Sequence, residues 1–322
     1  MLIDKIFKIS LQNTPAQAEP SVINVYFINE PPRTLIDTGI KSEPSIDALR
    51  NGLKAYGLDL TAIERILVTH GHIDHYGLAK RLSSISSAPM YVHREEQGGL
   101  QRIINSLDFR RHVFLRNGGP ETMVDAIEKL AISAMGFADN LEDVLFLEEG
   151  EVIPFESTML KVIHTPGHTP GHLCFYLQKE KILFSGDHLI KNEVPFPDMH
   201  VVGSSPPFHY MGLKEYLASL KKIEQLDIST AFPGHGEEIC DVKKLIVGIF
   251  DYYQNLINRV SLSLSERKTP FEIVRELFPD ASLLFKIFGL YKILGILEIL
   301  KEKGMVEWEE KGEKDYYFSR GK

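Results

Sequence analysis

Cysteine is scarce in this sequence, with two residues, Cys174 and Cys240, in a chain of 322. They lie far apart and outside any C-x-x-C pattern, which argues against a disulfide framework. The sequence therefore predicts free, buried thiols, which are typical of a reducing compartment. We expect a cytoplasmic protein.

The sequence also lacks long hydrophobic runs. No stretch of 18 or more apolar residues occurs, so we expect no membrane-spanning helix. The first seven residues lack the basic region, the long apolar region and the cleavage site of a signal peptide. Both absences agree with the expected cytoplasmic location.

Basic charge is not in excess. The chain has 36 lysines and arginines against 44 aspartates and glutamates, a net charge of −8. Such a balance disfavours nucleic acid and anionic membrane as partners. We therefore expect a small-molecule substrate. The length of 322 residues, 43% of them hydrophobic, fits one large domain or one domain with a small appendage.

Metal-ligating residue types, in contrast, are concentrated in one short stretch. Residues 70–75 form an H-x-H-x-D-H pattern between a predicted strand at 65–69 and a helix-favouring stretch from 78. In extended backbone, side chains two apart point the same way, so His70 and His72 can reach one ion. Asp74 and His75, at the helix start, can reach a second ion. Imidazole and carboxylate are the usual ligands of catalytic zinc.

Three further candidate ligand residues follow in order along the chain. His168 lies in H-T-P-G-H-T-P-G-H at 164–172, Asp187 in F-S-G-D-H at 184–188, and His235 in F-P-G-H-G at 232–236. Each lies near a glycine, where the backbone can pass close to an ion. This ordered set of motifs resembles the metallo-beta-lactamase fold superfamily of hydrolases, over residues 1–240.

The resemblance implies a dinuclear metal site with seven ligands. His70, His72 and His168 would hold the first ion, Asp74, His75 and His235 the second, and Asp187 would bridge both. The two divalent ions would be zinc, with iron or manganese as alternatives. A bridging water would ionise near neutral pH and attack an electrophilic carbonyl or phosphorus, with Asp74 orienting it. No cysteine stands at a ligand position, which argues against antibiotic hydrolysis.

The resemblance also implies the fold class, an α+β, four-layer αβ/βα sandwich. Short strands are predicted at 21–28, 33–37, 65–69, 89–92 and 229–232, and five more between 144 and 184 would form the second sheet-rich half. The D-T-G sequence at 37–39 would support the metal-binding loops. We interpret Asp37 as a turn-forming residue rather than a catalytic one.

Residues 94–143 carry a helical pattern broken at 117–120 and make the gap between His70 and His168 longer than the fold needs. We interpret them as an inserted helical pair. A cap over the metal site and a packing or dimer contact are equally favoured roles for it.

The tail has its own pattern. A connecting helix is predicted at 241–260, followed at 261–322 by a winged-helix-like domain with helices at 270–278 and 283–303 and a hairpin at 305–319. Val306, Trp308, Tyr316 and Phe318 would share the core side of the hairpin. Residues 251–322 contain twelve basic and twelve acidic residues. This balance favours a stabilising or homodimer-forming role over nucleic-acid binding.

Three functions follow, in order of preference. The first is a dinuclear hydrolase of a small ester or thioester, similar to the glyoxalase II-like branch. The second is an endoribonuclease-like enzyme whose tail grips nucleic acid, and the third is a DNA-binding regulator with a metal-binding sensing domain. The long loop between Asp187 and His235 suggests that His200, His209 and Tyr210 contact the substrate.

Overall fold

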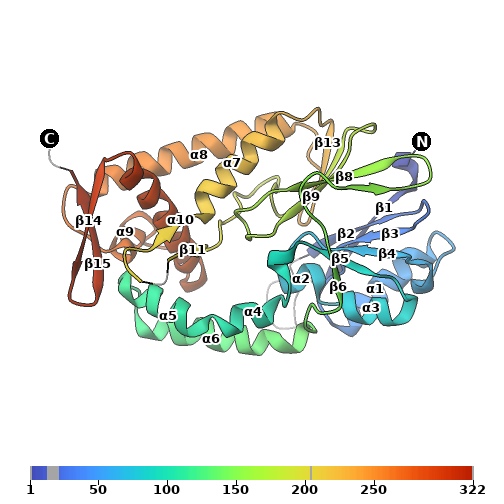
Figure 1. Cartoon of the computed structure of the whole chain (residues 1–322), viewed down its shortest axis with the longest axis horizontal. Coiled ribbons are helices and arrows are strands. Elements are labelled where there is room, and N and C mark those ends of the chain that lie inside the picture. The colour runs from blue at the N-terminus through green and yellow to red at the C-terminus, as the bar shows by residue number, and fades with distance from the viewer. Residues whose placement is uncertain (1, 13–21, 204, 321–322) are drawn as a thin grey trace.

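Two mixed sheets lie together in one half of the molecule in the computed structural model, which describes residues 2–12, 22–203 and 205–320 (Figure 1). The first sheet has, in spatial order, β1 (Ile6–Gln12), β2 (Val22–Ile28), β3 (Thr34–Ile36), β4 (Arg65–Leu67), β5 (Met90–Val92) and β6 (Val144–Phe146). The second has β13 (Thr230–Pro233), β10 (Ile182–Gly186), β9 (Leu173–Leu177), β8 (Met159–His164) and β7 (Val152–Pro154). A short ribbon joins β11 (Val201–Val202) to β12 (His209–Tyr210).

The helices of the described residues are, in chain order, α1 (Glu43–Lys54), α2 (Ile73–Tyr76), α3 (Ala79–Ser86), α4 (Leu100–Asn105), α5 (Leu107–Arg116), α6 (Glu121–Ala134), α7 (Gly212–Glu224), α8 (Val242–Ser263), α9 (Pro270–Leu277) and α10 (Leu283–Glu302). The predicted helices at 241–260, 270–278 and 283–303 correspond to α8, α9 and α10.

Alternating side chains place each sheet between two apolar layers. In β2, Val25 and Phe27 pack toward α1 and α3, whereas Tyr26 and Ile28 pack between the sheets. In β9, Leu173 and Phe175 face the same inter-sheet core, and Cys174 and Tyr176 face α7 and α8. Since successive strand residues point to opposite faces, each strand contributes to two cores. The predicted mixed α+β fold, with helices outside two facing sheets, is confirmed.

The first sheet differs from expectation at both edges. Strand β1 was not predicted from the sequence, although its burial alternates strictly between outside and core. The predicted place of residues 144–147 in the second sheet-rich half is wrong, because β6 pairs in parallel with β5. Parallel neighbours require a long crossover connection, and residues 94–143 supply it here.

The insert contains three helices, α4, α5 and α6, rather than the expected pair. They extend away from the sheets toward α10 and the C-terminal hairpin (Figure 1). Phe114 and Val124 of the insert share a buried cluster with Leu294 of α10 and Leu220 of α7. The insert, the second sheet's helices and the tail are therefore packed around one common core.

The tail consists of α9, α10 and a hairpin of β14 (Val306–Lys311) and β15 (Lys314–Ser319). α9 begins with a capping box, in which Thr269 and Glu272 satisfy each other's backbone N–H groups. The order of helix, helix and hairpin is the one expected from the sequence. The winged-helix likeness itself stays a prediction.

The core side of this hairpin was predicted in part wrongly. Val306 and Trp308 lie opposite Ser319 and Tyr317, and Tyr317 is 3% exposed. The prediction chose Tyr316 and Phe318, which are only half-buried. A two-residue loop pairs Lys311 with Lys314, so even positions of β14 share a face with odd positions of β15.

A buried ion pair joins the insert to the hairpin. Arg116, the last residue of α5, pairs with Asp315 of β15 and also approaches Glu310. The Arg116 and Asp315 side chains are 8% and 2% exposed. Burial raises the pKa of Asp315, and Arg116 opposes that rise. The hairpin is thus fixed to the insert by a charge pair as well as by apolar contacts.

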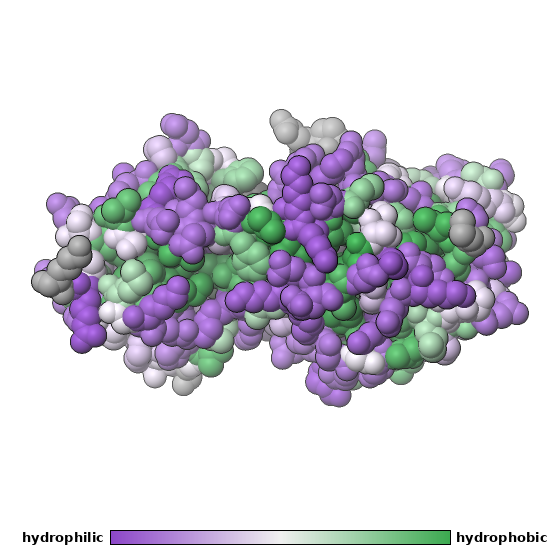
Figure 2. Space-filling view, turned by 90° about the horizontal axis from the view of Figure 1, so that it is seen from above, coloured by the Kyte–Doolittle hydropathy of each residue, from purple (hydrophilic) through white to green (hydrophobic). Residues whose placement is uncertain are grey.

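Within the described residues, no helix combines the length and hydrophobicity that crossing a bilayer would require. Figure 2 shows hydrophilic residues spread over both halves of one face, with hydrophobic residues between them. The two cysteines are free, and Cys174 is buried as expected. Cys240 is exposed, so the expectation of burial was wrong for that thiol.

Candidate metal centre

The seven predicted ligands lie in loops that leave neighbouring strand ends. His70 and His72 follow β4, and Asp74 and His75 lie in the first turn of α2, whose N-cap is His72. The remaining three lie between β8 and β9, after β10 and after β13, and they are His168, Asp187 and His235. In Figure 1, α2 lies between the strands and helix α4.

The first group consists of three histidines whose ring nitrogens converge. His72 Nδ1 lies 2.9 Å from His70 Nε2 and 3.1 Å from His168 Nε2. All three nitrogens lie within 4.8 Å of one another, a spacing that suits ligands of one ion. All three rings are buried or partly buried.

The second group combines a carboxylate with two histidines. Asp74 Oδ2 lies 3.3 Å from His235 Nε2 and 3.8 Å from His75 Nε2. Burial opposes protonation of His235, but Asp187 and Asp74 raise its pKa to about 9. The two carboxylates therefore attract positive charge to this group, which favours a cation there.

Asp187 contacts both groups. Its Oδ2 lies 3.6 Å from His168 Nε2 and 3.5 Å from His235 Nε2, and its Oδ1 lies 3.5 Å from His75 Nε2. The structure thus brings all seven predicted residues together, with Asp187 in the position expected of a bridging ligand. Metal binding by them stays a prediction.

The donor set fits divalent ions. Within the part of the chain that the structure describes, His75 Nε2 and Asp187 Oδ1 are buried without a hydrogen-bond partner. Buried polar atoms without partners are costly, and a metal ion would satisfy them. Burial, and then the neighbouring His72, lower the pKa of His168 to about 4. Its ring is neutral at pH 7, the form that binds metal.

Outer partners hold the ligand rings in place. In each of three histidines the second ring nitrogen, Nδ1, has a partner. His75 Nδ1 lies 2.8 Å from Asp37 Oδ2, His235 Nδ1 lies 2.8 Å from the Val22 carbonyl oxygen, and His168 Nδ1 lies 3.0 Å from the Phe196 carbonyl oxygen. Such partners set ring orientation and ligand basicity.

Asp37 supports the metal-binding loop, as the resemblance implied. It has a positive φ of 59°, and its Oδ1 also accepts a hydrogen bond from the Thr69 backbone N–H at 2.8 Å. The turn-forming interpretation of Asp37 is therefore incomplete, since its carboxylate also orients the His75 ring.

Glu96 is a functional residue that the sequence analysis missed. It is fully buried at the start of the insert. Its Oε2 accepts a hydrogen bond from Gly71 N at 2.9 Å, and its Oε1 accepts one from Gly171 N at 2.6 Å. Gly71 separates His70 from His72, and Gly171 lies in the loop of His168. One carboxylate therefore joins the two loops that form the first group. Glu96 lies in an ordinary charged run, so no sequence motif marks it.

Replacing Glu96 by glutamine should lower metal affinity by about 10- to 100-fold, the usual cost of losing an outer-shell partner. A glutamine has one acceptor oxygen, so one of the two glycine N–H groups loses its partner. Competition with a chromophoric chelator measures the change. Glu95→Gln, at the exposed neighbouring residue, is the matched control. Equal affinities for the two variants would show that Glu96 does not position the loops.

The three residues suggested as substrate contacts have partners of their own. His200 Nδ1 lies 2.8 Å from Glu215 Oε2, and His209 Nδ1 lies 2.8 Å from Glu298 Oε1. The Tyr210 hydroxyl, which is buried, accepts a hydrogen bond from Asn117 Nδ2 at 2.8 Å. These contacts tie the loop to α7, α10 and α5. Substrate contact by the three residues stays a prediction.

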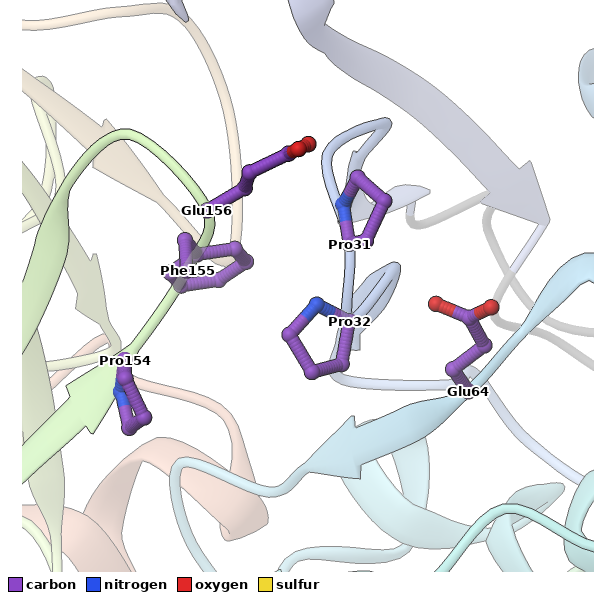
Figure 3. Close-up of a pocket in the computed structure, with 6 residues that line it drawn as sticks. All are labelled: Pro31, Pro32, Glu64, Pro154, Phe155 and Glu156. Carbon is purple, nitrogen blue, oxygen red and sulfur yellow. The ribbon is translucent and has the colours of Figure 1, made fainter.

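An open hollow of about 620 Å³ lies at the opposite ends of β3 and β4 from the metal cluster. Figure 3 shows its lining residues, Pro31, Pro32, Glu64, Pro154, Phe155 and Glu156. Pro32 and Glu64 precede the two strands, whereas the ligands follow them. The hollow contains no histidine and is separate from the candidate centre.

Comparison with known proteins agrees with this geometry. Residues 18–235 match the model of the metallo-beta-lactamase superfamily. The probable metallo-hydrolase YqjP of Bacillus subtilis is 28% identical over 88% of this chain and 90% of its own. The hydroxyacylglutathione hydrolase GloC of Haemophilus influenzae is 26% identical over 58% of this chain and 74% of its own.

A similar solved structure extends the comparison to the insert and the tail. The metallo-beta-lactamase family protein TTHA1429 of Thermus thermophilus superposes with a TM-score of 0.81 at 27% identity, covering 99% of this chain and 100% of that one. The family model alone spans more than half of the chain. The chain therefore belongs to the metallo-beta-lactamase superfamily.

Proposed function

We propose that this protein is a dinuclear metal-dependent hydrolase of a small ester or thioester. The observation that carries the proposal is the contact of Asp187 with both ligand groups, within 3.6 Å of His168 and 3.5 Å of His75 and His235. The similarity to a hydroxyacylglutathione hydrolase supports the choice of a thioester.

When bound, a pair of divalent ions would make a water molecule acidic enough to ionise near neutral pH and would stabilise negative charge on the substrate oxygen. The protein's own residues set the geometry. Burial favours the neutral form of Asp74, but His75 and His235 hold its pKa well below the usual range. Asp74 is thus an ionised acceptor that can orient the attacking water.

We propose zinc as the native metal, although iron and manganese accept the same donors. A cytoplasmic location and a homodimer contact through the tail are further parts of this proposal. The lack of basic excess in the sequence supports a small-molecule substrate over nucleic acid.

A turnover panel on metal-loaded protein tests the proposed function. It contains a glutathione thioester, an aryl ester, a phosphodiester and single-stranded RNA, each with chelator-stripped protein as the control. We expect hydrolysis of the thioester or ester that depends on metal. Cleavage of RNA alone would overturn the proposal in favour of a nuclease whose C-terminal tail binds the RNA.

A further inference from the structure

Two aromatic rings lie beside the first ligand group. The Phe196 ring centroid is 5.0 Å from that of His168 and 6.1 Å from that of His72. Phe288 of α10 stacks on Phe196, with centroids 3.9 Å apart and planes 12° from parallel. Both phenylalanines are half-buried. We call this pair the aromatic ledge.

The ledge is held in place from several sides. The Phe196 carbonyl lies 3.0 Å from His168 Nδ1, so the segment that carries the ring also orients a ligand. The Pro195 carbonyl accepts a hydrogen bond from the Tyr253 hydroxyl at 3.3 Å, and the Val194 carbonyl accepts one from Lys292 Nζ at 3.3 Å. A surface fixed in this way can bind a ligand without losing much conformational entropy of its own.

Two arginines near the ledge are paired with carboxylates. Arg110 of α5 contacts Asp198, two residues beyond Phe196, at 3.4 Å. Arg102 of α4 contacts the buried Glu96 at 3.5 Å. Because each guanidinium already faces a carboxylate, this side of the centre is better suited to an uncharged group than to a phosphate.

A small cavity lies near the ledge. The Tyr291 ring lies 6.5 Å from that of Phe288 and also lines a cavity of about 70 Å³ between the insert and α10. Ile103, Leu107 and Met199 are among its apolar walls. Arg110, Arg111 and Glu128 also line this cavity, so its wall is apolar with charged groups at some positions.

We propose that the acyl group of the substrate is an aromatic ring or an extended hydrocarbon chain that packs on the aromatic ledge. The inference rests on the proposed ester or thioester hydrolysis and names the substrate class. Water adds its oxygen to the acyl carbon, the bond from that carbon to sulfur or oxygen breaks, and the leaving group takes the proton. The products are an apolar acid and a thiol or alcohol.

Matched thioesters of one thiol, with acetyl and phenylacetyl as the acyl groups, test the proposal. We expect kcat/KM to be roughly tenfold or more higher for phenylacetyl, the scale of discrimination that an apolar pocket gives. Phe288→Ala should bring the ratio close to one, mainly by raising KM for phenylacetyl. Phe288→Leu, which keeps an apolar side chain, should give an intermediate ratio.

Phe285→Ala is the control, since Phe285 lies on the same helix but is 69% exposed. It should keep the preference of the wild-type protein. A ratio near one in the wild-type protein, or an unchanged ratio in Phe288→Ala, would overturn the proposal while leaving the hydrolase function intact.

Equilibrium binding separates the two proposals. Calorimetry with the unreactive acids phenylacetate and acetate should show tighter binding of phenylacetate to the metal-loaded protein, and loss of that difference in Phe288→Ala. If neither the two thioesters nor the aryl ester of the turnover panel is hydrolysed but phenylacetate still binds selectively, the proposed function fails and the ledge stands. Equal binding of the two acids would overturn the proposal that the acyl group packs on the ledge.

Discussion

Replacing Asp187 by asparagine should lower metal occupancy and turnover by more than about a hundredfold. Losing an outer-shell partner alone costs about 10- to 100-fold in affinity or activity, and Asp187 contacts both ligand groups directly. The substitution keeps the shape of the side chain but removes its negative charge. Without the negative charge of Asp187, the repulsion between two cations held close together would be offset less. Elemental analysis of the purified protein and the turnover panel measure the two losses.

Glu156→Gln provides the matched control. It also removes one carboxylate charge, at an exposed residue in the hollow at the other ends of β3 and β4. This variant should keep both metals and full activity. If the asparagine variant at position 187 retained two ions per chain with ordinary turnover, Asp187 would not bridge the centre.

Replacing Arg116 by methionine should lower the free energy of unfolding by about 3–5 kcal/mol, the usual cost of removing one partner of a buried ion pair. Asp315 would remain buried without its cation. Burial already raises its pKa in the presence of Arg116, and the substitution should raise it further. The destabilisation should therefore be fully present at neutral pH and shrink as acid protonates Asp315. Denaturant unfolding at several pH values measures it.

Two variants control for this effect. Arg111→Met, also on α5, removes a guanidinium from more exposed pairs with Asp125 and Glu128 and should cost far less stability, because solvent screens exposed ion pairs. Adding Asp315→Leu to Arg116→Met should restore most of the lost stability. If the Arg116 and Arg111 variants were equally stable, the hairpin would not depend on the buried pair.

The ligand set could be predicted from the sequence because its chemistry is local. Four of the seven ligands fall within six residues, and the other three each lie near a glycine. The helices with marked periodicity, such as α8 and α9, could be predicted for a similar reason. A repeating pattern depends on neighbours in the chain, not on distant partners.

The parts that could not be predicted depend on distant pairing. Glu96 has no motif, and its role appears only when Gly171 is folded against it. The stacking of Phe196 on Phe288 joins residues from a loop and from the tail. Which side chains of the hairpin face the core depends on the register of the two strands. A register error of one residue placed Tyr316 in the core instead of Tyr317. The placement of β6 likewise follows from its parallel pairing with β5.

The contacts of Glu96 also bear on the order of folding. Its bond to Gly71 closes a loop of 25 residues, and its bond to Gly171 closes one of 75 residues. Longer loops cost more entropy to close and tend to close later. The histidine loop after β4 can thus be ordered by the insert first, and the loop of His168 docks onto the same carboxylate afterwards. A nascent chain would complete its first ligand group only once the loop between β8 and β9 has been synthesised.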